Sequence, residues 1–302
     1  MAKALSKYLN ARTLMYLANV NMTAKYLVAG QFAGQHRSPF HGFAIEFAGH
    51  RAYVPGDDLK HLDWRVYFKT DRFVIKQYEQ ETNFVCHLVI DKSRSMHYMS
   101  GDVSKLEYAK QLAMCLTYLI VKQSDSVGLA TFDEHLREVF PPSTSLSQVY
   151  RTAQLFDDLE PSEKTDLGRV LMDYSQRIGR RGIVIVMSDF FGDQESLMRG
   201  LQRLRYDNHE VVLFHILDDY EIRFPFEGMT KFIGLEVPED EELTQPEQIR
   251  RQYLDRINGF LRDLRRTCER NRVEHVLVNT AVPQGHMLLG YLNSRRELAG
   301  NK

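Results

Sequence analysis

The sequence predicts an α/β fold with a largely parallel central sheet and helices on both faces, together with a smaller N-terminal subdomain. Strand-like and helix-like runs alternate from about residue 81 to residue 293. The strand-like runs are almost continuously apolar, which is typical of parallel strands that are covered on both faces. Before residue 81 this alternation is lost, so we expect a domain boundary near residue 80.

The main domain, residues 81–302, contains several runs with the composition of β-strands. They are NFVCHLVI, SVGLATF, GIVIVMS, EVVLFHIL and VEHVLVNT. Between the first two lies KLEYAKQLAMCLTYLIVKQ, whose apolar residues recur at helical spacing. The segment SVGLATFDEHLREVFPP resembles two strands joined by a short turn, so one edge of the sheet is expected to be antiparallel. Residues 224–246, which include the acidic VPEDEEL, are expected to form a long loop insertion.

The N-terminal subdomain is expected to comprise residues 1–80 and to pack on the sheet. It has a helical start, a stretch rich in glycine and aromatic residues, and the strand-like run FVIKQYE. Trp64 is the residue that we expect to be buried where this subdomain meets the sheet.

The composition excludes several classes of protein. The chain has 302 residues, of which 43% are apolar and 26% charged, as in an ordinary globular protein. Its formal net charge of −1, and the mixture of arginines with acidic residues in its basic clusters, argue against nucleic acid or an anionic membrane as a partner. The cysteines, Cys86, Cys115 and Cys268, are odd in number and lie in apolar stretches, which predicts buried free thiols in a reducing compartment. No run approaches the ~18 apolar residues that a membrane span needs, so we expect a cytoplasmic protein.

Oxygen-bearing side chains follow the first strand of the main domain, in the sequence DKSRS. Alternation in an extended segment would send Asp91, Ser93 and Ser95 to the same side, at the carboxyl end of a strand where α/β sheets bind ligands. An oxygen-only set of this kind suits Mg²⁺ or Mn²⁺ better than zinc. The alternative is that the serines cap the helix that follows.

Two later junctions supply further oxygen ligands. Thr165 lies just before a helix in KTDLGRVL, and Ser188 and Asp189 end the strand GIVIVMS. Taken singly, each has a plain explanation, because Thr165 or Asp166 can be a helix N-cap and Ser188 can begin a turn. Three such junctions in order along an α/β chain are more specific to a metal site than any one of them.

These residues carry a family resemblance. Asp91, Ser93, Ser95, Thr165 and Asp189 together resemble the metal-ion-dependent adhesion site of von Willebrand factor A domains. The chain is more similar still to a bacterial branch, the domain-of-unknown-function 58 family. That similarity extends over about residues 28–295 and rests on RAYVPGDDLKHLDW, VIKQYEQET, KLEYAKQLA, TDLG, SDFF and HILDDYE. Many members of that family have transmembrane helices before this block, so we expect a short soluble member.

The resemblance implies a Mg²⁺ (or Mn²⁺) site. In it, Ser93 and Ser95 bind the ion directly, Thr165 binds it directly or through water, and Asp91 and Asp189 hold waters. The remaining position would take an Asp or Glu from a partner protein. The family also implies a MoxR-type AAA+ ATPase as partner, with this chain acting as an adaptor or co-chaperone and not as an enzyme. The expected rim of the site consists of Lys92, Arg94, Met96, His97, Phe190 and Phe191.

The alternative function is a metal-dependent hydrolase. It would use the same site or a second cluster, Asp57, Asp58 and Asp63, which has His50 and His61 nearby. A structural interpretation of that cluster is that its aspartates cap a helix or pair with neighbouring arginines. The sequence has no P-loop, dinucleotide, HExxH or GxSxG motif, so those enzyme classes lack their usual local residues. His87, in an apolar strand, is expected to be a core histidine.

Overall fold

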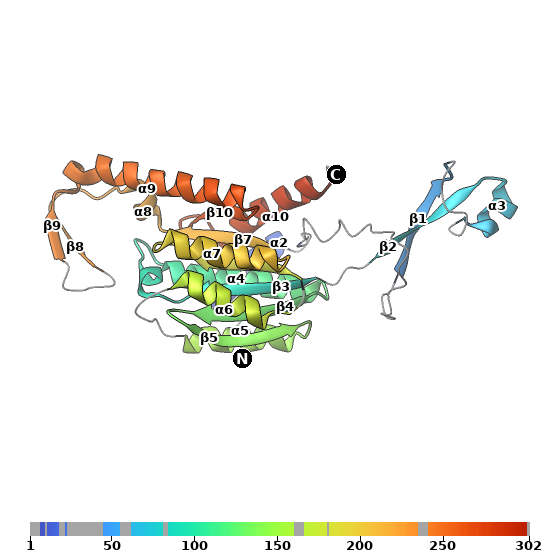
Figure 1. Cartoon of the computed structure of the whole chain (residues 1–302), viewed down its shortest axis with the longest axis horizontal. Helices are drawn as coiled ribbons and strands as arrows, with labels where there is room; N and C mark the ends of the chain where they lie inside the picture. Colours follow the sequence, from blue (N-terminus) through green and yellow to red (C-terminus); the bar gives the residue numbers. More distant parts are fainter. Residues whose placement is uncertain are drawn as a thin grey trace. The chain divides into compact units, whose positions relative to one another are not determined.

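A computed structural model describes residues 7–9, 11–17, 22, 45–54, 62–80, 84–159, 166–179, 181–234 and 241–300 (Figure 1). The chain divides into two compact units. The large unit consists of residues 1–27 and 84–302, and the small unit of residues 28–83. The boundary near residue 83 agrees closely with the expected one, but the first 27 residues belong to the large unit. The reason is that α2 (Ala11–Leu17) contacts α10 (Gln284–Gly300) and α4 (Lys105–Lys122).

The large unit is built on a six-stranded sheet with the strand order β10-β7-β6-β3-β4-β5. All neighbouring pairs are parallel except β4 and β5, which are antiparallel, so both the parallel sheet and its antiparallel edge are confirmed. The strands are β3 (Val85–Asp91), β4 (Ser126–Phe132), β5 (Leu136–Ser143), β6 (Ile183–Ser188), β7 (Glu210–Leu217) and β10 (Glu274–Asn279).

Helices cover both faces of this sheet, as Figure 1 shows. Every residue of β6 and β7 is buried, which explains why these strands are apolar throughout and do not alternate. The core has two parts. One lies under α4, α5 (Ser147–Asp158) and α10, and the other under α6 (Leu167–Arg177), α7 (Gln194–Tyr206) and α9 (Pro246–Arg270). Within the described residues, no helix is both long enough and apolar enough to cross a membrane.

The parallel strands bring several junctions to one edge of the sheet. β3 ends at Asp91, and its neighbour β6 ends at Ser188, because Ile90 and Met187 are paired in register. β7, on the other side of β6, ends at Leu217 and is followed by Asp218 and the short helix α8 (Asp219–Arg223). The side chains that follow these strands therefore gather at this edge.

The insertion after α8 is partly ordered and is not a long loop throughout. Residues 230–233 and 241–244 form two short antiparallel strands, β8 (Thr230–Ile233) and β9 (Glu241–Thr244). At the base of this hairpin, Phe224 stacks on Tyr253 of α9, with ring centroids 4.3 Å apart. This aromatic contact ties the insertion to the large unit.

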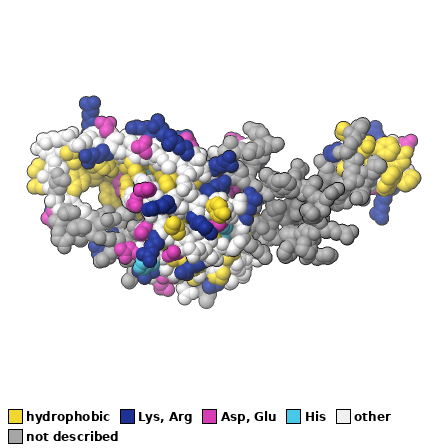
Figure 2. Space-filling view, viewed as in Figure 1, with side chains coloured by type: hydrophobic (Ala, Val, Ile, Leu, Met, Phe, Trp, Pro, Cys, Tyr) yellow, Lys and Arg dark blue, Asp and Glu magenta, His cyan; other side chains and the backbone are white. Residues whose placement is uncertain are grey.

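The small unit contains β1 (Ile45–Ala52), β2 (Val74–Gln80) and the helix α3 (Trp64–Thr70). β1 and β2 are antiparallel. The expectation that Trp64 is buried was wrong, because its side chain is 52% exposed at the first turn of α3. Figure 2 shows the hydrophobic surface of this unit, to which Phe68 contributes.

The three cysteines are free and buried, as expected. Burial raises the pKa of each thiol well above its ordinary value, so none is a nucleophile at neutral pH.

Candidate functional site

The carboxylate of Asp91 is the centre of the candidate site. Ser188 Oγ donates a hydrogen bond to Asp91 Oδ2 (2.6 Å), and the backbone N–H of Ser93 donates to Asp91 Oδ1 (2.8 Å). The structure therefore brings the end of β3 and the end of β6 into direct contact. Asp91 is only 1% exposed, so these two donors hold its carboxylate in place below the surface.

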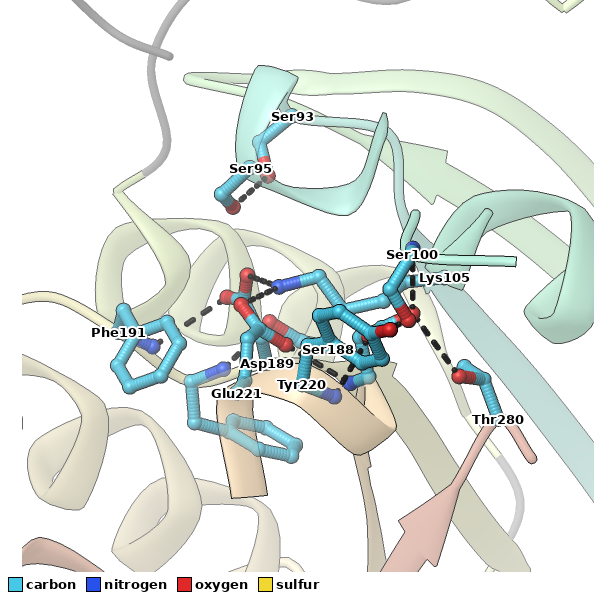
Figure 3. A network of polar contacts seen from close by, with 12 residues as sticks. Ser93, Ser95, Ser100, Lys105, Ser188, Asp189, Phe191, Tyr220, Glu221 and Thr280 are labelled. Carbon is cyan, nitrogen blue, oxygen red and sulfur yellow. Dashed lines mark hydrogen bonds and ion pairs between the residues drawn. The ribbon is translucent and has the colours of Figure 1, made fainter. Parts of the chain in front are cut away.

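The two serines of DKSRS lie side by side. Ser93 Oγ and Ser95 Oγ are 3.1 Å apart, and Figure 3 shows the contact between them. The sequence argument placed them on one side of an extended strand, but the structure reaches the same result in another way. Ser95 lies in a short 3₁₀ helix, η3 (Arg94–His97), and this turn brings its hydroxyl back to Ser93. Neither serine accepts a capping hydrogen bond at the start of η3, so the capping alternative does not account for Ser93.

Asp189, which follows Ser188, is also buried, with 2% of its side chain exposed. Burial and the nearby charge of Asp189 together raise the pKa of Asp91 to about 6. Two carboxylates thus lie near each other with little water to screen them. The site contains an excess of negative charge that a cation would relieve.

A buried lysine forms the part of the site that the sequence analysis missed. Lys105 is fully buried, and its Nζ donates to Asp189 Oδ2 (2.9 Å) and to Glu221 Oε1 (2.7 Å), as Figure 3 shows. Burial alone would lower the pKa of Lys105, but the charges of Asp189 and Glu221 outweigh it and raise that pKa above its ordinary value. Lys105 is therefore a permanent ammonium between two carboxylates.

One sequence signal for Lys105 existed. It is the first residue of α4, directly after the N-cap Ser104. A lysine is unfavourable at this position, because the helix dipole places partial positive charge there. A lysine that opens a helix in an otherwise apolar segment indicates an acidic partner elsewhere in the fold.

Glu221 connects Asp189 and Lys105 to α8 and to the end of β10. Its second oxygen accepts a hydrogen bond from the backbone N–H of Asp218 (2.8 Å), the N-cap of α8. Asp218 in turn accepts from the backbone N–H of Ser100 (3.0 Å) and from Thr280 Oγ1 (3.3 Å). This network, drawn in Figure 3, fixes the helices and loops that surround the strand ends.

Thr165, the third expected metal ligand, lies outside the described residues. Its neighbour Asp166 is the N-cap of α6 and accepts a hydrogen bond from the backbone N–H of Arg169 (3.1 Å). Next to Asp166 is a cavity of about 120 Å³, which Ser188 and Phe190 also line. The junction that carries Thr165 thus leads to the side of the site where Ser188 lies.

The rim of the site differs from the expected one. Met96 and Phe190 are buried, with 0% and 2% of their surface exposed, and belong to the core. Phe190 has a backbone φ of +53°, which turns its side chain inward and leaves Phe191 42% exposed. Of the two phenylalanines, only Phe191 is available to a partner.

The second acidic cluster is only partly described. Asp63 caps α3, accepting hydrogen bonds from the backbone N–H groups of Arg65 (3.0 Å) and Val66 (3.3 Å), and its other oxygen lies 2.9 Å from His50 Nε2. These contacts agree with the structural interpretation of Asp63. Asp57, Asp58 and His61 lie outside the described residues. In the part of the chain that is described, no three His, Cys, Asp or Glu side chains converge as metal ligands, so a metal at the sheet edge would depend on hydroxyl oxygens.

Comparison with known proteins follows from this geometry. Residues 49–258, more than half of the chain, match the family described as "Protein of unknown function DUF58". The chain is 25% identical over 215 residues to the uncharacterized protein Rv1480 of Mycobacterium tuberculosis, which covers 70% of this chain and 67% of that protein.

Two solved structures are similar in fold. The conserved hypothetical protein BatB from Bacteroides thetaiotaomicron aligns with a TM-score of 0.49 and 14% identity over 71% of this chain and 99% of its own. The SpRpn10 VWA domain aligns with a TM-score of 0.39 and 17% identity over 72% of this chain and 97% of its own.

Proposed function

The chain belongs to the DUF58 family, and from this membership and the geometry of the sheet edge we propose that it is a protein-interaction module whose site binds Mg²⁺ or Mn²⁺. The observation that carries the proposal is the pair of serine hydroxyls beside two buried carboxylates. The proposal has three parts, which are the ion, the partner and the absence of catalysis.

The described residues fit a small, hard divalent ion. Adjacent ligands of an octahedral Mg²⁺ with bonds of 2.0–2.1 Å are separated by about 2.9–3.0 Å. Ser93 Oγ and Ser95 Oγ are 3.1 Å apart, close to that separation. The carboxylates of Asp91 and Asp189 lie deeper, where they can accept hydrogen bonds from metal-bound water. All of these donors are oxygen atoms, as Mg²⁺ and Mn²⁺ require.

The charge of the site supports the same ion. Asp91, Asp189 and Glu221 contribute three carboxylates, whereas Lys105 contributes one ammonium. Lys105 is occupied by Asp189 and Glu221 and leaves Asp91 with neutral donors alone among the contacts described above. In the proposed site, Ser93 and Ser95 hold the ion, with Thr165 as the third protein ligand.

The bound ion supplies an electrophilic position for a carboxylate from another protein. Neutral hydroxyls withdraw little charge from a dication, so an incoming Asp or Glu replaces a water with a gain in electrostatic energy. Phe191, which is 42% exposed, provides an apolar contact beside that position. We propose a MoxR-type AAA+ ATPase, or a client protein that it remodels, as the partner, with this chain as an adaptor or co-chaperone.

A binding experiment with a matched control tests the metal part. We expect Mn²⁺ to bind at one site by isothermal titration calorimetry, and the double variant Ser93→Ala/Ser95→Ala to weaken binding at least tenfold. The control is Ser145→Ala/Ser147→Ala. This second serine pair has the same spacing in sequence, and its hydroxyls are 2.9 Å apart on the exposed surface. Equal Mn²⁺ affinity in the two double variants would contradict the assignment.

The partner is tested by affinity purification from a cell extract with EDTA, with excess Mg²⁺, and with the Asp189→Asn variant. The metal-bridge proposal requires the same ATPase or client to be lost with EDTA and with Asp189→Asn, and to return with Mg²⁺. A partner retained at full strength in EDTA contradicts it.

The hydrolase alternative is tested separately. Turnover of generic phosphate or peptide substrates by the purified protein, abolished by the Ser93→Ala/Ser95→Ala substitutions, would favour that alternative over an adaptor.

A further inference from the structure

A second cavity lies at the other end of the sheet, where β3 and β4 begin. It has a volume of about 580 Å³, within the range of about 300–1,000 Å³ that small-molecule sites occupy. Val85 and Ser126, the first residues of β3 and β4, line it together with the C-terminal end of α6. The strand ends that carry Asp91 and Ser188 lie at the opposite edge of the sheet, so this cavity is separate from the proposed metal site.

The walls of this cavity are mainly apolar. The edge strand β5 contributes several of the side chains, and Ile178, just after α6, faces them across the cavity. Two successive prolines on β5 have no N–H to donate, so this part of the edge presents hydrocarbon and little polar backbone. The apolar lining residues are Val85, Val139, Phe140, Pro141, Pro142 and Ile178.

The innermost lining residues are polar but uncharged. His87 and Tyr174 are 2% and 1% exposed, and His87 Nδ1 lies 3.0 Å from Tyr174 Oη. Burial, with a smaller contribution from His209, lowers the pKa of His87 to about 4, so the ring is neutral at pH 7. Within the described residues, the Nε2 atom of His87 has no hydrogen-bond partner.

The charge of the lining is one-sided. Arg177, in the last turn of α6, is exposed at the cavity, and it forms no ion pair within the described part of the chain. Among the described lining residues there is no Asp or Glu to offset it. An arginine near a helix C-terminus is favourable for the helix itself, but here it is also a cation facing an apolar cavity.

From the size, the apolar walls and the single cation, we propose that this cavity binds a small amphipathic carboxylate. The hydrocarbon or aromatic body of such a molecule packs against Phe140 and the two prolines. Its carboxylate pairs with Arg177, which offers the planar pair of N–H donors that matches a carboxylate. A peptide or a neutral apolar compound lacks one of these two features.

The probe for this site is 4-phenylbutyrate, with the uncharged 4-phenylbutyramide as its matched compound. We expect 4-phenylbutyrate to bind the full-length protein at one site by isothermal titration calorimetry, and at least fivefold more tightly than the amide. Arg177→Gln should remove that preference. Arg169→Gln is the control, because Arg169 is an exposed arginine two turns earlier in α6 and is not among the residues that line the cavity.

A second variant tests the location. Val139→Phe adds volume to the wall, and it should weaken both compounds at least fivefold while the far-UV circular dichroism stays unchanged. The proposal is overturned if 4-phenylbutyrate does not bind, if it binds Val139→Phe as tightly as wild type, or if Arg177→Gln and Arg169→Gln bind it equally. Because no metal is present in these titrations, the result is independent of the proposed metal site.

Discussion

Lys105 is the residue on which the ion-pair network at the sheet edge depends. Its ammonium is fully buried between Asp189 and Glu221, at 2.9 and 2.7 Å. Placing a charge in the interior is costly, and the cost is offset only while all partners are present. Lys105 therefore has a structural role at the floor of the proposed site, which the serines and Asp91 do not share.

We expect Lys105→Met to lower the free energy of unfolding by about 3–5 kcal/mol, because it leaves two carboxylates unpaired in the interior. Urea titrations followed by circular dichroism measure this. Lys231→Met is the matched control, since Lys231 and Glu241 form an exposed ion pair at 2.6 Å. Exposed pairs contribute about 0–1 kcal/mol, so equal losses in the two variants would show that Lys105 is not held as described.

His87 provides a test by pH. The unfolded chain protonates this histidine near its ordinary pKa of 6.5, whereas burial lowers its pKa to about 4 in the folded protein. Between these values the unfolded state binds more protons. The stability present above pH 6.5 is thus lost as the pH falls toward 4, by up to about 3 kcal/mol.

We expect His87→Gln to remove this part of the acid destabilisation. The measurement is the difference in free energy of unfolding between pH 7 and pH 4, which should be smaller in His87→Gln than in wild type. His135→Gln, at an exposed histidine, should leave the difference unchanged. If both variants keep the wild-type difference, His87 already titrates normally in the folded protein.

At the residue level, the sequence predicted which oxygen-bearing side chains meet at the sheet edge but not what surrounds them. Asp91, Ser93, Ser95 and Asp189 follow strands, and strand ends are recognisable from apolar runs. The contact between Lys105 and Asp189 spans 84 residues and depends on how α4 packs, which no local pattern records. Trp64 was misplaced for a related reason, because a large aromatic residue is usually buried but nothing local shows whether its helix has a neighbour.

At the level of elements, the close packing of α6 against α7 shapes the cavity beside Ser188. A Cβ atom on Gly168 would lie 2.2 Å from the backbone oxygen of Ser196 in α7, and one on Gly200 would lie 2.8 Å from the backbone oxygen of Gly168. Both glycines are therefore required for the two helix backbones to approach. This gives a physical reason for the glycine in the sequence TDLG.

We expect Gly168→Ala to destabilise the protein by about 1–3 kcal/mol, because the added methyl group forces α6 away from α7. The matched control is Gly259→Ala in α9, where the nearest atom to a new Cβ is the Arg262 guanidinium at 4.0 Å. Alanine is a better helix former than glycine, so this control should be neutral or more stable by up to about 1 kcal/mol. Thermal melts of the two variants that shift in the same direction would contradict the packing argument.

The predictability of the elements follows their length and burial. The run EVVLFHIL coincides with β7 and SVGLATF with β4, because strands of seven or eight buried residues leave a clear apolar signal. β8 and β9 have four residues each, and β9 begins with two glutamates, which are uncommon in strands. Their pairing depends on the antiparallel register between residues 230–233 and 241–244, so composition alone predicted a loop.

On the scale of the whole molecule, the two units differ greatly in the amount of core that they contain. The large unit has two hydrophobic clusters on opposite faces of its sheet. Among the described residues of the small unit, only Leu62, Asp63 and Ile75 are buried. The DUF58 match begins at residue 49, inside β1, and therefore includes most of the small unit and the large unit as far as α9. The family thus retains the small unit although little core stabilises it.

We predict that the two units unfold separately and that metal stabilises only the large one. The chain has one tryptophan, Trp64, in the small unit, so tryptophan fluorescence reports on that unit alone. Far-UV circular dichroism is dominated by the helices of the large unit. Because a small core stabilises weakly, the fluorescence transition should occur at a lower urea concentration than the circular dichroism transition.

Adding Mn²⁺ distinguishes the units further, since a ligand that binds only the folded state stabilises it by about 2.7 kcal/mol at 100 times its Kd. Asp91, Ser93 and Asp189 all lie in the large unit, so Mn²⁺ should raise the midpoint of the circular dichroism transition and leave the fluorescence transition where it was. The Ser93→Ala/Ser95→Ala variant should lose this shift, and Ser145→Ala/Ser147→Ala should keep it. If both transitions coincide without metal and move together when Mn²⁺ is added, the two units fold as one cooperative body, and the small unit contributes to the stability of the site itself.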